Sequence, residues 1–378
     1  MRHENSVFHG LLKQVPWSEF DRLVEEHRAD YRVRRLTTKG QLIALLYGQL
    51  CGASSLREIE IGLCSHRARL YHLGGDEIAR STLADANAGR PAALFEALYA
   101  AVVRQASAGL RRKLADTVHL IDATGVSLTG EWARFSAKAC GAKVHVVYDP
   151  DADLPIYAAV TPAKVNDITQ AKTMPVTPGA TYVFDLGYYD YGWWASLDQA
   201  GCRVVSRLKK YAPLHQVEER PVAGDGPILS DRTGMLNKRV GGGKRNPYAK
   251  PVREVCVRID TGKVLRIVTN DLDAPAQTIA DLYKRRWRIE LFFRWVKQTL
   301  KIRRFLGQSR NAVTIQIMVA LIAFVLLRIA QTVLSTIESP LAFARLVRAN
   351  LMHRKTFSDL LKPPKPNKPN SAQLQLTF

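Results

Sequence analysis

The chain has 378 residues, 47% of them hydrophobic and 24% charged, which is the composition of a globular protein too long for one hydrophobic core. Its 55 Lys and Arg outnumber 34 Asp and Glu, and the resulting net charge of +21 indicates a polyanionic partner. The basic residues are spread over the whole chain and neither end has a basic amphipathic helix, so nucleic acid is favoured over an anionic membrane.

The cysteines exclude a disulfide scaffold and a zinc finger. They are scattered, without a CxxC pair or a Cys/His cluster at zinc spacing, at Cys51, Cys64, Cys140, Cys202 and Cys256. The first residues carry no apolar signal segment, so we expect a cytoplasmic, nucleoid-associated protein. The longest apolar run, residues 317–327, is too short to span a bilayer and predicts a buried core helix and no membrane partner.

Residues 1–112 are predicted to form an all-α N-terminal domain. Ser55 and Glu58 have the spacing of a capping box at the start of a helix. Short helices joined by tight turns, with many basic residues among them, suit a DNA-binding module of helix-turn-helix type. These basic residues are Arg32, Arg34, Arg35, Lys39, Arg67, Arg69 and Arg80. The alternative is a helical bundle with ordinary surface charge.

From residue 117 the hydrophobic pattern changes to that of β-strands. Strands are predicted at residues 117–122, 142–149, 154–161, 181–187 and 203–208, and helices at 166–174 and 191–201. Three antiparallel strands followed by strand–helix alternation predict a mixed α/β sheet.

A β-rich insertion is predicted at residues 208–269, where a basic region containing Gly and Pro precedes strands at 253–259 and 264–270. Residues 113–207 and 270–335, on either side of the insertion, are predicted to form the α/β core. Residues 336–378 are predicted to form a C-terminal helix and a low-complexity, disordered tail that begins at Pro363.

Residues 283–304 are predicted to lie on a helix that carries nine Lys and Arg but a single acid, Glu290. At about 100° per residue, Tyr283, Arg286, Glu290 and Lys297 fall within a sector of roughly 60° on one face. Solvated helices normally mix their charges, so an isolated carboxylate among cations is unusual. A carboxylate that binds a metal ion, beside cations that bind phosphate, explains this pattern.

Two Asp residues close apolar strands: Asp122 ends VHLID and Asp185 ends TYVFD. A carboxylate at the end of a buried strand is held rigidly at the edge where ligands bind in α/β sheets. With Glu290 these residues supply three carboxylates, enough for two divalent ions. Oxygen ligands without His or Cys favour Mg²⁺ or Mn²⁺ over zinc. For either Asp alone, a structural role in a turn is the simpler interpretation.

Several aromatic and histidine side chains have simpler structural explanations. Trp287 and Trp295, which flank Glu290, are expected to pack against neighbouring helices. His119 and His145 on apolar strands are expected to be core histidines and not metal ligands.

The sequence resembles the DDE transposases of the bacterial insertion-sequence-four family. The matching motifs are LIDATG around Asp122, GAKVHVVYDPDADLP after it, VFDLGYY around Asp185, and YKRRWRIELFFRWVK around Glu290. The last motif has the family spacing Y-x2-R-x3-E-x6-K. The resemblance covers roughly residues 117–335, and the N-terminal helices resemble the domain that precedes this region in many members. It implies a ribonuclease H-like catalytic core interrupted by a β-rich insertion.

The resemblance also implies roles. Asp122, Asp185 and Glu290 would hold two metal ions, and Tyr283, Arg286 and Lys297 would bind DNA phosphates. The implied activity is cut-and-paste transposition by phosphodiester hydrolysis and strand transfer through a hairpin intermediate. The implied partner is double-stranded DNA, both the terminal inverted repeats and the target, bound by a homodimer.

The insertion departs from the family pattern at one position. Members known for hairpin chemistry have a Trp in the last insertion strand that stacks a flipped base, and the matching residue here is Leu265. Either Tyr248 in the preceding loop replaces it, or base flipping works differently.

Two other functions compete with a transposase. One is a ribonuclease H-like nuclease that cuts without strand transfer, although a simple nuclease has no need to hold a hairpin. The other is a domesticated, non-catalytic DNA-binding protein, against which the presence of all three carboxylates counts.

Overall fold

The computed structural model describes residues 6–110, 117–127, 141–222, 226–239, 241–299, 307, 309–333 and 339–361. Helices α1 to α7 form the N-terminal part: Val7–Leu12, Trp17–Glu26, Thr38–Cys51, Leu56–Cys64, Arg67–Leu73, Arg80–Gly89 and Ala92–Leu110. Ser55 caps α4, since its Oγ accepts a hydrogen bond from the Glu58 N–H at 3.2 Å. The Glu58 carboxylate accepts from Ser54 N at 2.7 Å and not from Ser55 N, so the predicted capping box is half right.

A single mixed sheet follows, in the order β3-β2-β1-β4-β5-β9-β8-β7-β6. Its strands β1 to β9 are Val118–Ser127, Gly141–Asp149, Leu154–Pro162, Thr181–Val183, Arg203–Arg207, His215–Arg220, Ile228–Met235, Pro251–Arg258 and Val264–Thr269. The first three are antiparallel, β1, β4 and β5 are parallel, and β5 pairs with β9 in antiparallel fashion. This confirms the predicted mixed α/β sheet after a helical N-terminal region.

Both faces of the central strands are covered, because alternate residues point to opposite sides. Leu120 and Val183 belong to the larger hydrophobic cluster, whereas Ile121 and Tyr182 belong to the smaller one. The short segments between the strands are α8 (Asp167–Ala171), η1 (Leu186–Tyr188), α9 (Tyr191–Gln199) and η2 (Gly241–Gly243). Residues of α9, Trp194 among them, pack into the smaller cluster.

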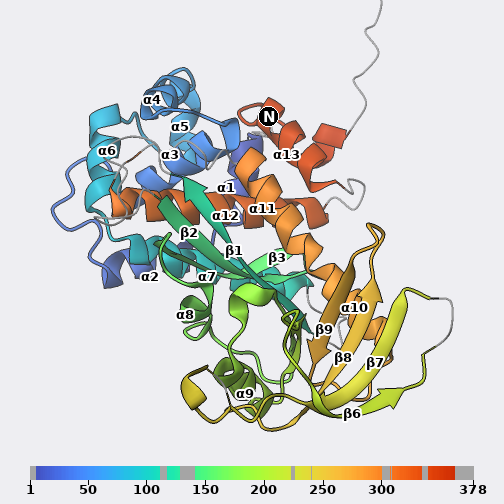
Figure 1. Cartoon of the computed structure of the whole chain (residues 1–378). Helices are drawn as coiled ribbons and strands as arrows, with labels where there is room; N and C mark the ends of the chain where they lie inside the picture. The colour runs from blue at the N-terminus through green and yellow to red at the C-terminus, as the bar shows by residue number, and fades with distance from the viewer. Residues whose placement is uncertain are drawn as a thin grey trace, which may run out of the picture.

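The C-terminal helices return to the N-terminal ones. They are α10 (Ala276–Arg285), α11 (Trp287–Thr299), α12 (Arg310–Val333) and α13 (Pro340–Asn350), followed by η3 (Ser358–Leu361). Figure 1 shows α12 lying among α1 to α7, with β6 to β9 at the opposite end of the molecule. By length and composition α12 could cross a membrane, but 89% of its most apolar stretch is buried inside the protein, as the predicted core helix requires. The predicted tail from Pro363 lies outside the described residues.

A buried ion pair fixes the strands that lead into α10. Arg253 on β8 donates to both oxygens of Asp231 on β7, at 2.8 and 2.6 Å, and the two side chains are only 3% and 5% exposed. The same guanidinium donates to the carbonyls of Leu272 and Ala274 in the turn before α10. One buried cation therefore holds the distal strands and the start of the α10–α11 segment together.

We predict that Asp231→Ala lowers the free energy of unfolding by about 3–5 kcal/mol, because it leaves the Arg253 charge buried without its partner. Urea unfolding followed by circular dichroism measures the loss. Glu77→Ala is the matched control, since the Arg67–Glu77 pair is exposed at 77% and 47% and is expected to contribute about 1 kcal/mol or less. Equal losses in the two variants would contradict the role given to the buried pair.

Candidate active site

Asp122 lies in β1, and Asp185 comes two residues after the end of the neighbouring parallel strand β4. The register pairs Val118 with Thr181 and Leu120 with Val183, and the same offset continued by two residues pairs Asp122 with Asp185. Neighbouring strands are about 4.8 Å apart, so the two carboxylates are adjacent. β1 continues past Asp122, so this residue lies inside a strand and not at its end as predicted. It is still at the edge of the parallel part of the sheet, because β4 ends at Val183.

Local hydrogen bonds orient both carboxylates. Oδ1 of Asp122 accepts from the N–H of Ala123 at 2.8 Å. Asp185 is the N-cap of η1, and its Oδ1 accepts from the N–H of Gly187 at 2.8 Å. Each side chain keeps a second oxygen for another ligand.

Arg286 joins the third carboxylate to this pair. Its Nη2 donates to Oε1 of Glu290 at 2.5 Å, and its Nη1 lies 3.7 Å from Oδ2 of Asp122. The guanidinium also lies 5.9 Å from the centre of the Tyr283 ring. The structure thus brings Asp122, Glu290, Arg286 and Tyr283 together, with Asp185 beside Asp122.

The predicted continuous helix over residues 283–304 is interrupted at Arg286, where α10 ends and α11 begins. Two successive i to i+3 hydrogen bonds mark the break, from Arg286 N to Tyr283 O and from Ile289 N to Arg286 O.

Lys297, farther along α11, lines a small apolar cavity with Thr124 and Val126 of β1. Residues 300–304 lie outside the described part of the chain.

The site has an excess of negative charge. The pKa of Asp122 is raised to about 6, chiefly by burial and also by the charges of Asp185 and Glu290, while the Ala123 N–H and Arg286 oppose the rise. The effect of both neighbours shows that the three carboxylates are close enough to influence one another.

The donor set suits Mg²⁺ or Mn²⁺ in chemistry, because it consists of carboxylate oxygens whose mutual repulsion a cation relieves. Within the described residues, no three His, Cys, Asp or Glu side chains are close enough to ligate one ion. Arg286 lies between Asp122 and Glu290 and supplies the positive charge there. Shared ligation by all three carboxylates therefore requires this guanidinium to move.

Four further predictions concern aromatic and histidine side chains. Tyr248 is only 5% exposed, packed in the smaller hydrophobic cluster, so the prediction that it could stack a base is wrong. Trp295 packs edge-on against Phe324 as predicted, but Trp287 is 52% exposed, contrary to prediction. His145 is buried as predicted, yet its Nδ1 has no hydrogen-bond partner among the described residues.

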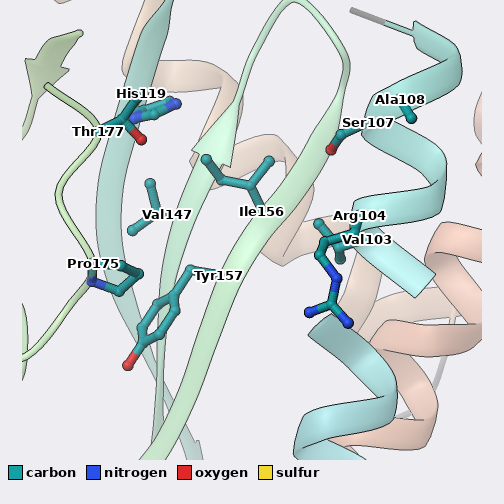
Figure 2. Close-up of a pocket in the computed structure, with 10 residues that line it drawn as sticks. All are labelled: Val103, Arg104, Ser107, Ala108, His119, Val147, Ile156, Tyr157, Pro175 and Thr177. Carbon is teal, nitrogen blue, oxygen red and sulfur yellow. The ribbon is translucent and has the colours of Figure 1, made fainter. Parts of the chain in front are cut away.

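A cavity of about 510 Å³ lies beside the carboxylates. Its lining includes Leu265, Tyr283, Arg286 and Trp287, together with basic residues of the sheet and of α10. A second hollow, of about 570 Å³, lies between α7 and β3 and is lined by His119, Tyr157 and others (Figure 2). It contains none of the candidate residues, so we assign it no role.

One acidic residue near this site was not predicted from the sequence. Asp167, the first residue of α8, faces Asp185, and Lys143 of β2 donates to it at 2.8 Å. In the sequence Asp167 lies where a helix is expected to begin, and Asp is common at such positions. Nothing in the sequence therefore marked it as a residue of the site.

Adjacent carboxylates on a mixed sheet, next to basic side chains that can bind phosphate, are typical of enzymes that break phosphodiester bonds. Comparison with known proteins agrees. Residues 113–326 match the family model described as a transposase DDE domain, and residues 3–75 match a domain of unknown function, DUF4372, typical of insertion-sequence-four transposases. The chain belongs to the DDE transposase family. It is therefore an enzyme that cleaves and transfers DNA strands, and this chemistry depends on divalent metal ions.

Individual relatives give the same result. The putative transposase y4zB of Sinorhizobium fredii is 40% identical over 308 residues, covering 78% of this chain and 85% of the relative. The probable transposase for insertion sequence element IS5377 of Geobacillus stearothermophilus is 31% identical over 245 residues, 63% of each chain. A solved piggyBac transposase synaptic complex with hairpin DNA aligns over 96% of this chain and 81% of that chain, but at 11% identity and a TM-score of 0.43 it carries no argument.

We predict that Asp122→Asn stabilises the metal-free protein at pH 8 by about 1–3 kcal/mol, since one pKa unit is worth about 1.4 kcal/mol. The folded-state pKa, about 6, lies above the ordinary value of 3.8. The carboxyl group therefore contributes stability that is fully present below pH 3.8 and is lost as the pH rises through 6. Urea unfolding in EDTA at pH 8 and pH 4.5 measures the difference, which should shrink at the lower pH.

Asp198→Asn is the control with the opposite sign. Burial raises the Asp198 pKa, but hydrogen bonds from Lys250 and Asn270 outweigh burial and leave it below its ordinary value. This variant should lose stability at pH 8. An Asp122→Asn protein that is less stable than wild type at pH 8 would contradict the electrostatic description of the site.

Proposed function

We propose that this transposase catalyses cut-and-paste transposition of an insertion sequence, with Asp122, Asp185 and Glu290 as its catalytic carboxylates. The observation that carries the proposal is the Arg286 guanidinium, which contacts Asp122 and Glu290 while Asp122 lies level with Asp185. Two acids from separate elements therefore meet one guanidinium, and the third acid, Asp185, influences the charge of Asp122. Metal-dependent hydrolysis frees a 3′-OH, which attacks the opposite strand to form a hairpin and, after reopening, attacks target DNA.

The catalytic core is proposed to be ribonuclease H-like. The order β3-β2-β1-β4-β5, with three antiparallel strands followed by two parallel ones, supports this assignment, as does the sequence resemblance. In this proposal residues 113–207 and 270–335 form the core and residues 208–269 the insertion, although the insertion strands extend the same sheet. Residues 1–112 and 336–378 form the flanking parts.

The three carboxylates are proposed to hold two Mg²⁺ or Mn²⁺ ions. When bound, such ions activate the attacking oxygen and stabilise the leaving one. The burial of Asp122 beside two other acids favours this role, because a bound cation would offset both the burial and the repulsion that raise its pKa. The charge of two ions would also release Arg286 from its carboxylate partners.

Tyr283, Arg286 and Lys297 are proposed to bind DNA phosphates. Arg286 presents a planar fork that suits two phosphate oxygens as well as it suits the carboxylates it contacts here. Tyr283 lies under the guanidinium and limits its orientations. Lys297 is farther along α11, where its flexible ammonium can follow the strand.

The cavity beside the carboxylates is proposed to receive an unstacked base. Leu265 lines it at the position where related proteins have a Trp, and Trp287 lines it from α11 with about half of its surface exposed. An exposed indole beside an apolar wall provides a stacking surface worth about 1–3 kcal/mol per base. Trp287, and not the buried Tyr248, would then compensate for Leu265.

The N-terminal helices are proposed to bind the ends of the insertion sequence. The protein would act as a homodimer on double-stranded DNA, in the cytoplasm at the nucleoid. Arg32, Arg34 and Arg35 are exposed between α2 and α3 and suit phosphate contacts. Two other predicted basic residues have partners in the protein: Arg67 pairs with Glu77, and Arg69 donates to the carbonyl of Met352.

We predict that Asp122→Asn, Asp185→Asn and Glu290→Gln each abolish Mg²⁺-dependent cleavage of DNA carrying the inverted repeats that flank the gene. Binding of the same DNA should remain within about threefold of wild type, because affinity rests on Lys and Arg contacts to phosphate. Cleavage and mobility-shift assays measure the two properties. Cleavage retained in any one variant would remove that residue from the catalytic set.

A second prediction separates a transposase that forms hairpins from one that does not. Arg286→Ala, Lys297→Ala and Trp287→Ala should reduce hairpin formation by about tenfold or more but first-strand nicking much less, because the hairpin brings phosphates together and needs an unstacked base. One charged contact is worth about 1.5–3 kcal/mol. A denaturing gel on end-labelled DNA resolves the two products over time.

Arg35→Ala is the control for general loss of DNA affinity, and it should reduce both products equally. Wild-type protein that nicks but never produces hairpin or joined DNA would show that the hairpin route is wrong and would favour cleavage without strand transfer.

A further inference from the structure

Four polar side chains near Asp122 and Asp185 form a cluster, and they are not among the proposed catalytic or phosphate-binding residues. The cluster consists of Lys143 and His145 on β2, Asp167 on α8 and Tyr188 on η1. Lys143 Nζ donates to Asp167 Oδ1 at 2.8 Å and to the Val165 carbonyl at 2.9 Å. This ion pair ties α8 to β2, and α8 in turn contacts η1.

Asp167 is directed towards Asp185. A Cβ placed on Gly187 would be 3.0 Å from Oδ1 of Asp185 and 3.3 Å from Oδ2 of Asp167, so both carboxylates border the same point. Lys143 neutralises the Oδ1 side of Asp167, whereas Oδ2 has no hydrogen-bond partner among the described residues. Two carboxylates this close to each other attract a cation or a set of hydrogen-bond donors.

Two buried polar atoms face the same space. Tyr188 is fully buried, its hydroxyl has no partner within the described chain, and burial raises its pKa, as do the charges of Asp122, Asp167 and Asp185. His145 Nε2 bonds to Thr161 Oγ1 at 2.8 Å, but its Nδ1 is buried without a hydrogen bond, 3.9 Å from Asp167 Oδ1. Native proteins rarely leave buried polar atoms unsatisfied, so these atoms point to water or a ligand.

The chemistry of the neighbouring acids identifies that ligand. Mg²⁺ binds proteins through one or two carboxylates and keeps several of its waters. Such waters need acceptors and donors in the next layer, and an Asp with a free oxygen beside a tyrosine hydroxyl supplies both. His145 faces Lys143 and Asp167, and burial lowers its pKa to about 4, so it is neutral at physiological pH and can accept a hydrogen bond at Nδ1.

We propose that Asp167 and Tyr188 are positioning residues of the catalytic centre, which hold the water molecules around the divalent ion that Asp185 binds. The inference rests on the proposed catalytic role of Asp185. Asp167 acts as an acceptor oriented by Lys143, and Tyr188 acts as a donor from η1, the same turn that Asp185 caps. Neither residue touches the DNA or the reacting atoms.

The proposal can be tested without DNA by measuring how tightly the full-length protein binds Mn²⁺. The electron paramagnetic resonance signal of the free ion reports how much Mn²⁺ remains unbound. Asp167→Asn and Tyr188→Phe should weaken Mn²⁺ binding by about 10- to 100-fold, the range found for groups that orient a metal site indirectly. Asp185→Asn should abolish the site. Asp198→Asn, which removes a Lys-paired Asp elsewhere on α9, should leave it unchanged.

Thermal unfolding supplies a second readout. In EDTA, Tyr188→Phe should melt at or above the wild-type temperature, because it removes a buried hydroxyl that has no partner in the described chain. Added Mn²⁺ should raise its melting temperature less than that of wild type. A purely structural role for Tyr188 would instead lower the melting temperature in EDTA.

The outcomes distinguish this inference from the proposed function. Unchanged Mn²⁺ affinity in Asp167→Asn and Tyr188→Phe, with binding abolished in Asp185→Asn, would overturn the positioning role alone. Mn²⁺ binding that survives Asp185→Asn, or a wild-type protein that binds no Mn²⁺, would overturn the metal assignment and this inference with it.

Discussion

The repulsion between carboxylates held together at one edge of a sheet is the constraint on which the rest of this structure depends. Asp122 and Asp185 are adjacent because two parallel strands share a register, and neither can move without shifting a buried strand. Water screens charges poorly in a partly buried site, so the protein must supply positive charge nearby. Arg286 provides it beside Asp122 and Glu290, while Lys143 balances the further carboxylate of Asp167.

This constraint explains why the remote parts of the chain share one core. α11 must approach β1 closely to bring Glu290 and Arg286 to the strand edge. It is held there by Phe292 and Phe293, which pack in the same hydrophobic cluster as α12. α12 in turn is buried among the N-terminal helices and α13. Packing in the helical part of the protein therefore sets the position of Glu290, one of the proposed catalytic carboxylates, and the Arg253–Asp231 pair sets the start of α10 from the opposite end.

The sequence was informative where local pattern and chemistry coincide, and uninformative where placement depends on distant contacts. The strands around Asp122 and Asp185 were predictable because buried parallel strands are short apolar runs, and Glu290 because it is alone among basic residues. The sequence does not predict β6 and β7 individually, because polar and apolar residues alternate only weakly along them. Their placement depends on pairing, of β6 with β7 and of β7 with β8. The break at Arg286 was missed because no Pro or Gly marks it. Asp167 and Trp287 were missed because their significance lies in neighbours that are far away in the sequence.

The guanidinium that balances the acids is also the one proposed to bind DNA phosphate, and its geometry suits both partners. A fork that bridges Asp122 and Glu290 has the spacing to bridge two phosphate oxygens. When divalent ions compensate the carboxylates, the electrostatic reason for Arg286 to remain between them disappears, while a nearby phosphate gives it a new partner. Metal binding and phosphate binding are then coupled through one side chain. Because linkage is reciprocal, DNA that draws Arg286 away should also increase the affinity of the acids for metal. Such coupling would make metal binding tighter when DNA is in place, without requiring DNA for the first ion to bind.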